Sequence, residues 1–224
     1  MNGCLPACIL FDLDGTLVDS LPGIEFSVRE AFENCKLPAP TESLRQIIGP
    51  PIRAILARAG NVADESMLNT LERAFRVSYD SEGWHQSVCF PDAQRVLRLL
   101  HEDGHRIFVV SNKPRHVSLQ ILEREQILEY FETVVTRDSR SPNYDGKEEM
   151  IRTLLAEHSI RSEDCVMAGD TTEDAKAAAI VGIKFIWMTH GYGSAAQMGS
   201  LPAEHSLNSF SQFLPLITKE PVCD

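Results

Sequence analysis

Short apolar runs that end abruptly in polar residues recur along the chain and indicate how it is organised. Runs of this length and composition are typical of strands buried in a parallel sheet. Segments with apolar residues at helical spacing follow several of these runs. The runs that we interpret as strands are 9–11, 106–111, 133–136, 165–169 and 185–188, with a weaker one near His205.

The segment from Leu21 to Trp84 differs, because its apolar residues recur at helical spacing and no strand pattern is visible in it. After a first helix, Thr41 can cap a second one over residues 41–48. Two more helices are predicted after the break at Gly49-Pro50-Pro51, and Asp64 can cap the second of them. We therefore expect a small all-helical insertion between the first strand and the rest of the sheet.

Two carboxylates follow the first predicted strand directly. Asp12 and Asp14 stand two positions apart where the chain leaves the strand, and Gly15 allows a sharp turn there. Ligands of open α/β sheets bind outside the carboxyl ends of the strands, so an aspartate here is well placed to meet a substrate. Crowded carboxylates are tolerated when Mg²⁺ neutralises them, and one can then act as a nucleophile while the other moves protons. A strand followed by a solvated acidic turn is the competing interpretation, which the apolar lead-in and the Gly-Thr exit disfavour.

Polar groups also follow two later strands. Ser111 ends the second long strand, where a hydroxyl beside a helix N-terminus can donate to a phosphate oxygen, and Asn112 comes next. Lys113 is expected to be a solvated side chain that flanks the site. Asp170 and Asp174 lie four residues apart as a helix begins, so both can face one side, although carboxylates there are also favourable for purely structural reasons.

Lys147 is predicted to lie in the first turn of a helix, and no other lysine occurs between Lys113 and Lys176. An ammonium at this end of a helix opposes the helix dipole, so its position is locally unfavourable. A functional role would be to neutralise a nucleophile and phosphoryl oxygens. From the residues alone, a functional and a structural role are equally open.

These residues, taken together, resemble the four motifs of the haloacid dehalogenase-like superfamily, and they follow the expected order. The matching positions are the string Phe11–Ser20, Ser111, Lys147 and the acidic cluster Asp170–Asp174. Within the superfamily, this string, the Gly49-Pro50-Pro51 element and the Gly191-Tyr192-Gly193 loop are most similar to phosphoglycolate phosphatases and nucleotidase-like members. The third motif departs from the common Gly-Lys-Pro form, because Glu148 follows Lys147.

The resemblance implies an α/β fold, in which a doubly wound parallel sheet forms a Rossmann-like hydrolase core with an inserted all-helical cap. Residues 1–20 and 85–224 would form the core and residues 21–84 the cap. The cap would close over the site, exclude water and recognise the leaving group.

The resemblance also implies an enzyme that uses Mg²⁺ to hydrolyse the phosphate monoester of a small phosphorylated metabolite. Asp12 would attack phosphorus and form an aspartyl-phosphate, and Asp14 would protonate the leaving alcohol and then activate water. The implied ligands of Mg²⁺ are Asp12, the backbone carbonyl of Asp14, Asp170 and Asp174. The other residues expected to act at the phosphoryl group or the substrate are Ser111, Lys147, Asn112, Gly15, Thr16 and Arg53. Arg53 is a candidate for reading an anionic substrate, and a solvated helix arginine is the competing interpretation.

Five alternatives remain. A metal-free dehalogenase has no need of a second aspartate two residues after the nucleophile, so Asp14 and Asp170 argue against it. A phosphonate-cleaving relative needs a cap lysine, and Lys36 at a helix end is the only one between Ser20 and Trp84. A sugar phosphomutase or a nucleotidase of the superfamily would keep the same core. A non-catalytic phosphate-binding module would use the fold as a scaffold, which the intact carboxylates and Lys147 disfavour.

Composition narrows the expected partners and location. The formal net charge of -11 argues against a nucleic-acid or an anionic-membrane partner. We recognise no signal peptide, and no run approaches the ~18 apolar residues of a membrane span. The 6 cysteines are scattered without CxxC spacing, which favours a reduced, cytoplasmic setting.

Overall fold

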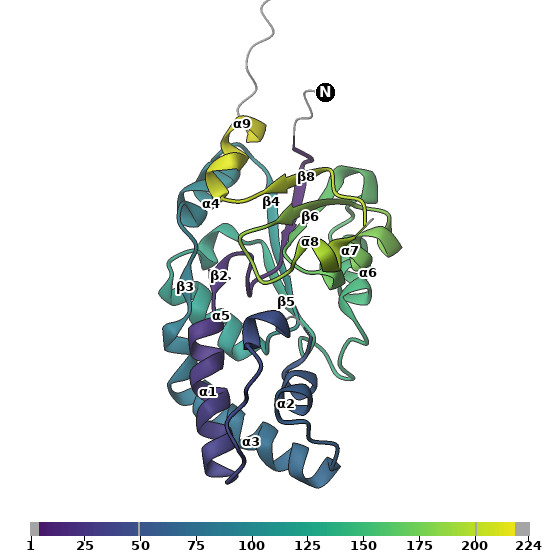
Figure 1. Ribbon diagram of the computed structural model, residues 1–224. Helices are drawn as coiled ribbons and strands as arrows, with labels where there is room; N and C mark the ends of the chain where they lie inside the picture. The colour runs from purple at the N-terminus through teal and green to yellow at the C-terminus, as the bar shows by residue number, and fades with distance from the viewer. Residues whose placement is uncertain (1–4, 49, 200, 218–224) are drawn as a thin grey trace, which may run out of the picture.

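The computed structural model describes residues 5–48, 50–199 and 201–217, and its centre is a 6-stranded sheet (Figure 1). Neighbouring strands are parallel and follow the order β5-β4-β1-β6-β7-β8. The strands are β1 (Cys8–Phe11), β4 (Arg106–Ser111), β5 (Thr133–Thr136), β6 (Cys165–Gly169), β7 (Lys184–Met188) and β8 (His205–Leu207). The strands predicted from the apolar runs are therefore confirmed, including the weak one near His205.

Separate apolar layers cover the two faces of the sheet, because side chains alternate along each strand. The helices that flank the sheet are α4 (Ala93–Glu102), α5 (Arg115–Arg124), α6 (Lys147–Glu157) and α7 (Thr172–Val181). Ile9 and Phe11 of β1 pack into the layer that holds α4 and α5. Cys8 and Leu10 pack into the opposite layer, which holds α6 and α7. Helices on both faces of a parallel sheet form the doubly wound α/β fold that was expected.

Helices α1, α2 and α3 lie together beyond the carboxyl edge of the sheet, at the lower end of the molecule in Figure 1. They span α1 (Leu21–Asn34), α2 (Ile52–Gly60) and α3 (Glu65–Ser81). Apolar side chains of α1 and α3, such as Phe32 and Leu71, are buried in the same core cluster. The Asp64 carboxylate accepts a hydrogen bond from the Met67 N–H at 2.7 Å, which confirms the predicted cap of α3.

The helix predicted over residues 41–48 is wrong. This stretch contains a single 3₁₀ turn, η1 (Leu44–Gln46). Leu44 in the turn and Ile47 directly after it are buried without a longer helix. Pro50 and Pro51 follow closely, and prolines disfavour continuation of a helix because they lack an N–H and restrict the preceding residue. Gly49, part of the predicted break, lies outside the described residues.

Two very short strands were not predicted. β2 (Val18–Asp19) and β3 (Val88–Cys89) pair antiparallel just before α1 and just after the 3₁₀ turn η2 (Gly83–Gln86). Strands of 2 residues produce no readable alternation, so only the tertiary fold reveals them. Their pairing holds the two ends of the helical segment next to each other.

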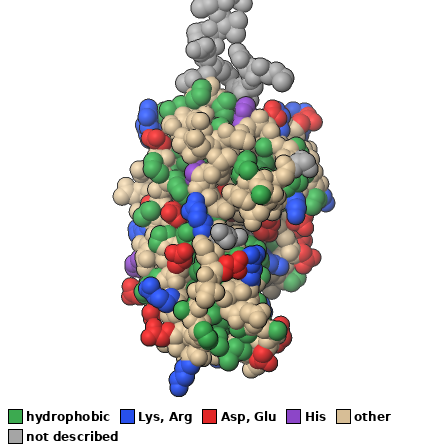
Figure 2. All heavy atoms as spheres, in the orientation of Figure 1, with side chains coloured by type: hydrophobic (Ala, Val, Ile, Leu, Met, Phe, Trp, Pro, Cys, Tyr) green, Lys and Arg blue, Asp and Glu red, His purple; other side chains and the backbone are tan. Residues whose placement is uncertain are grey.

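The remaining elements are short and lie mainly at the periphery. They are η3 (Leu128–Tyr130), η4 (Ser162–Asp164), α8 (Ala195–Met198), η5 (Phe210–Phe213) and α9 (Leu214–Ile217). Basic and acidic side chains are interspersed on the face drawn in Figure 2. Within the described residues, no helix combines the length and the apolar character that crossing a bilayer requires.

Candidate active site

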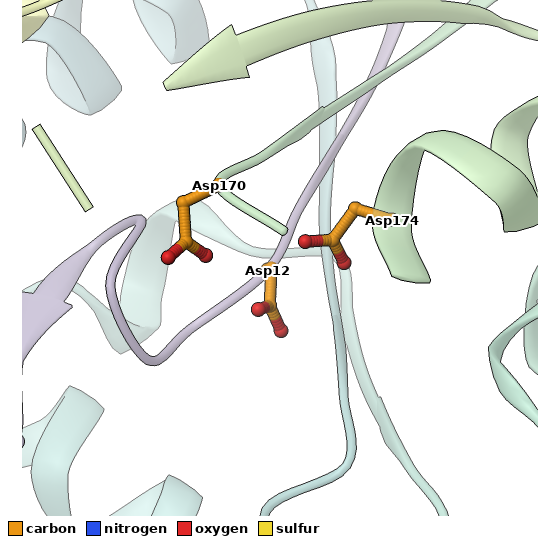
Figure 3. A group of neighbouring side chains, drawn as sticks. All are labelled: Asp12, Asp170 and Asp174. Atoms are coloured by element: carbon orange, nitrogen blue, oxygen red, sulfur yellow. The ribbon is translucent and has the colours of Figure 1, made fainter. Parts of the chain in front are cut away.

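Three predicted carboxylates meet at the carboxyl end of the sheet. Strands β1 and β6 are in register, with Phe11 opposite Ala168, and the Asp12 N–H donates to the Ala168 carbonyl at 3.0 Å. Asp12 and Asp170 therefore leave adjacent strands at the same edge. One carboxylate oxygen from each of Asp12, Asp170 and Asp174 lies within 4.8 Å of the others (Figure 3).

Lys147 brings a positive charge into this cluster. Its Nζ lies 3.0 Å from Asp12 Oδ1 and 2.5 Å from Asp174 Oδ1, and its side chain is only 2% exposed. Burial alone would lower the pKa of Lys147, but the charges of Asp12 and Asp174 raise it above the ordinary lysine value. Lys147 begins α6, as predicted, and these two carboxylates offset the unfavourable helix dipole there.

The cluster carries more negative charge than a single ammonium neutralises. Burial raises the pKa of Asp12 to about 7, with Lys147 acting in the opposite direction. Burial and the neighbouring carboxylates Asp174 and Asp12 raise the pKa of Asp170 well above its ordinary value. A divalent cation relieves this kind of crowding, and an all-oxygen donor set suits a hard cation such as Mg²⁺. The buried carboxylates therefore fit such a metal.

Hydrogen bonds fix the orientation of Asp170 and Asp174. The Asp170 carboxylate accepts from Thr16 Oγ1 at 3.2 Å and from the Tyr192 N–H at 2.7 Å. The Asp174 carboxylate accepts from the N–H and the hydroxyl of Thr171 at 2.9 and 2.7 Å. These neighbours set the direction in which each carboxylate faces the site.

Two glycines let the backbone approach Asp170 closely. A Cβ at Gly15 would lie 2.3 Å from Asp170 Oδ2, and Gly15 also has a φ of +80°. A Cβ at Gly191 would lie 2.3 Å from the Cβ of Asp170. Gly15 and Thr16 were expected to contact substrate, but the structure places both against Asp170, and neither lines the cavity.

Ser111 and Asn112 lie beside Asp12 on the wall of one cavity, at the end of β4. The Ser111 hydroxyl accepts a hydrogen bond from the Lys113 N–H at 3.3 Å. The Asn112 amide donates to Glu173 Oε1 at 2.8 Å. The structure thus places both polar groups on the wall of the cavity that Asp12 lines.

Asp14 lines the same cavity but stands apart from the three clustered carboxylates. Its Oδ1 accepts a hydrogen bond from Lys113 Nζ at 2.8 Å. The expectation that Lys113 is solvated is therefore wrong, since 4% of its side chain is exposed. The parallel pairing of β1 with β4 explains the contact, because both residues follow these adjacent strands.

The cavity lies between the sheet edge and helices α1 to α3. The helical segment contributes a largely apolar wall, made of Ile24, Ile48, Pro50, Pro51, Ile52, Ile55 and Phe75. Arg76 and Tyr79 of α3 complete it, and sequence reasoning missed both. Their position depends on how the helices pack, which the spacing of apolar residues does not reveal.

The structure does not bring Arg53 to the cavity. Its guanidinium hydrogen-bonds to Glu65 at 2.5 Å and to Glu72 at 3.1 Å, both on α3. Two nearby carboxylates therefore account for its orientation. Among the described residues of the helical segment, Arg76 is the cationic side chain that lines the cavity.

The loop at 190–193 also lies at the site, through Tyr192. The Tyr192 hydroxyl accepts from the Ser20 and Leu21 N–H groups at 2.8 and 3.0 Å, and it donates to Asp19 Oδ1 at 3.0 Å. These contacts tie the loop to the start of α1. Burial raises the pKa of Tyr192 well above its ordinary value, so the hydroxyl stays protonated and able to donate.

Known proteins share this arrangement of elements. A haloacid dehalogenase-like hydrolase from Streptococcus pneumoniae superposes with a TM-score of 0.86, at 23% identity, over 96% of this chain and 99% of that one. At this identity, the likeness shows the fold alone.

Two curated relatives are named for different activities. The tyrosine-protein kinase PtkA of Mycobacterium tuberculosis is 32% identical over 193 residues, which are 85% of this chain and 64% of that protein. The phosphoglycolate phosphatase of Vibrio parahaemolyticus is 26% identical over 217 residues, which are 93% of this chain and 95% of the relative. The sequence model of the haloacid dehalogenase-like hydrolases matches residues 9–188. The chain therefore belongs to the haloacid dehalogenase-like hydrolase family.

Proposed function

We propose that the protein is a phosphatase that hydrolyses the phosphate monoester of a small phosphorylated metabolite through an aspartyl-phosphate, with Mg²⁺ as its metal. The observation that carries the proposal is the buried Asp12 carboxylate, 3.0 Å from Lys147 and grouped with Asp170 and Asp174. A nucleophile, a fixed positive charge and a set of hard ligands are the parts that phosphoryl transfer needs.

In the proposed reaction, Asp12 attacks phosphorus and the bond between phosphorus and the ester oxygen breaks. Asp14 gives a proton to the departing alcohol and later takes one from the water that cleaves the aspartyl-phosphate, which restores Asp12. Lys147, Ser111 and Asn112 stabilise charge on the phosphoryl oxygens. Asp12, the Asp14 carbonyl, Asp170 and Asp174 would hold Mg²⁺, which when bound offsets negative charge on the carboxylates and the phosphoryl group.

The residues of the helical segment that line the cavity favour a role for this segment in selecting the substrate. We propose that residues 21–84 form a cap over a core made of residues 1–20 and 85–224. The wall facing Asp12 is largely apolar and carries Arg76, which suits a small leaving group with an anionic end. The phosphoglycolate phosphatase of Vibrio parahaemolyticus points to the same substrate class.

The free thiols of Cys8, Cys35, Cys89 and Cys165 support a reducing, cytoplasmic setting.

The test is a screen of purified protein against phosphoglycolate, sugar phosphates, nucleotides and an aryl phosphate, with and without Mg²⁺. We expect release of phosphate that chelation abolishes and Mg²⁺ restores, with phosphoglycolate among the best substrates. Full activity after exhaustive chelation would contradict the role of the metal. Absence of turnover on every phosphate monoester would overturn the proposed function.

A second candidate is transfer of the phosphoryl group to an acceptor hydroxyl instead of water. The observation that favours it is the 32% identity to the tyrosine-protein kinase PtkA. Incubation with labelled ATP and a tyrosine-containing peptide distinguishes the two candidates. Labelled peptide would favour the transferase, whereas an unlabelled peptide together with release of phosphate from phosphoglycolate would favour the phosphatase.

A further inference from the structure

Lys113 bridges Asp14 and the helical segment. Its Nζ donates to Asp14 Oδ1 at 2.8 Å and to the Tyr79 hydroxyl at 2.7 Å. The ammonium also lies 4.7 Å from the centre of the Tyr79 ring. Tyr79 is 3% exposed and the Lys113 side chain 4% exposed, so water has little access to this contact.

The three residues come from separate parts of the fold. Asp14 follows β1, Lys113 follows β4, and Tyr79 lies on α3, where its ring stacks on Phe75 with centroids 5.3 Å apart. The contact therefore joins the sheet edge to one helix of the proposed cap. Phe75 itself lines the cavity, so α3 touches both the leaving-group space and this bridge.

A buried ammonium needs a charged or hydrogen-bonding partner, and immobilising a lysine side chain costs rotamer entropy. The partner here is the carboxylate that the proposed mechanism uses for proton transfer. That carboxylate lies on the turn after β1 and is 24% exposed, and its bond to Lys113 Nζ restrains its rotamer. Proton transfer requires it to stay within hydrogen-bonding reach of the reacting oxygen.

We propose that Lys113 is a positioning residue that holds the Asp14 carboxylate in its working orientation, and that Tyr79 makes this hold depend on the placement of α3. The inference rests on the proposed phosphatase function and adds to it a link between the cap and the proton-handling group. With α3 in place, Lys113 is enclosed and Asp14 is restrained. With α3 displaced, Lys113 loses the hydroxyl and the ring that enclose it, and Asp14 is released.

A different role for Lys113 is direct binding of the phosphoryl group, since this residue also lines the cavity. The two roles predict different behaviour once Asp14 can no longer move protons. A positioning residue that acts through Asp14 has no further effect in an Asp14→Asn background, whereas a phosphoryl ligand still accelerates the attack of Asp12.

The experiment is a double-mutant cycle with p-nitrophenyl phosphate and Mg²⁺, followed in a stopped-flow instrument. Lys113→Met alone should give a burst of nitrophenolate near one equivalent, then steady turnover at least about 10-fold below the wild type. Lys113→Arg should recover most of this loss. In the Asp14→Asn background, Lys113→Met should change the rate of the burst by less than about 2-fold.

A burst slowed about 10-fold by Lys113→Met in the Asp14→Asn background would overturn the inference, because Lys113 would then act on the phosphoryl group itself. Wild-type turnover by Lys113→Met would also overturn it. Should Lys113→Met fail to fold, Tyr79→Phe keeps the ring and removes only the hydroxyl. We expect a loss of about 3- to 10-fold in steady turnover for Tyr79→Phe, and none of that loss in the burst of Asp14→Asn.

These outcomes separate the inference from the function on which it rests. A wild-type protein that hydrolyses no phosphate monoester overturns the proposed function. An active wild type whose turnover is unchanged by both Lys113→Met and Tyr79→Phe overturns only the role of the bridge.

Discussion

The sheet edge and the helical segment line the same cavity but contribute different kinds of residue. The edge supplies Asp12, Ser111 and Lys147, each at the end of a strand or the start of a helix. The helices supply mainly apolar side chains, together with Arg76 and Tyr79. The pairing of parallel strands places Asp12 and Ser111, the start of α6 places Lys147, and the packing of three helices determines the position of the second group. We infer that the type of reaction depends on the edge and the choice of substrate on the helices.

The largest loss is expected at the edge, from Asp12→Asn. An amide cannot attack phosphorus, so turnover should fall by at least about four orders of magnitude. Steady-state assays with phosphoglycolate and with an aryl phosphate measure this, and the exposed Asp103→Asn provides a control of the same chemistry. Residual activity within about 10-fold of the wild type would show that another group is the nucleophile.

Lys147→Ala should reduce kcat by roughly two to three orders of magnitude, the scale for losing one preorganised charge-stabilising group. The matched control is Lys176→Ala, because Lys176 is exposed and lies on the neighbouring helix α7. Circular dichroism should show that the fold is retained. Near-normal kinetics of Lys147→Ala would mean that the phosphoryl group is stabilised in some other way.

Metal binding should weaken as the pH falls through 7, because the pKa of Asp12 is raised to about 7 in the metal-free protein. Protons then compete with Mg²⁺ for the same oxygens, and the apparent affinity should drop by up to about 10-fold per pH unit. Calorimetric titration at pH 8, 7 and 6 measures this trend. An affinity independent of pH across this range would contradict the assignment of Asp12 as a ligand.

The same raised pKa predicts how the stability of the metal-free protein depends on pH. Burial raises the pKa of Asp12 from the ordinary 3.8 to about 7, so the folded state binds more protons than the unfolded chain in this window. The Asp12 contribution to stability is therefore present below pH 4 and is lost as the pH rises toward 7. In thermal unfolding, Asp12→Asn should remove this part of the pH dependence.

The smallest effect is expected at the helices, where Arg76→Met should raise the KM for phosphoglycolate about 10-fold and leave kcat nearly unchanged. Arg53→Met is the matched control, because both arginines pair with Glu72 but only Arg76 lines the cavity. An aryl phosphate without a carboxylate should not distinguish either variant from the wild type. Equal effects of Arg76→Met and Arg53→Met on the KM for phosphoglycolate would show that Arg76 does not bind the anionic end of the substrate.

These two regions also differ in how far the sequence predicts them. The convergence of Asp12 and Asp170 was predictable, since the carboxyl ends of buried parallel strands meet at one edge of a sheet. The position of Lys147 was implied only by the family resemblance, because it begins the helix α6 and does not directly follow a strand. The bridge from Lys113 to Tyr79 was not predictable, because it joins residues 34 positions apart through the packing of α3 against the edge. Arg53 and Arg76 illustrate the same limit. Both are arginines in predicted helices, and only the tertiary structure shows which of them lines the cavity.

The most direct test of the account is to trap the aspartyl-phosphate on Asp12 with the Asp14→Asn variant. This variant keeps its backbone carbonyl but cannot activate water, and the phenolate of an aryl phosphate leaves without needing a proton. After mixing with aryl phosphate and Mg²⁺, mass spectrometry of the acid-quenched protein should show one phosphate added, located on Asp12 by peptide mapping. Steady turnover by Asp14→Asn without such an adduct would contradict the two-step mechanism.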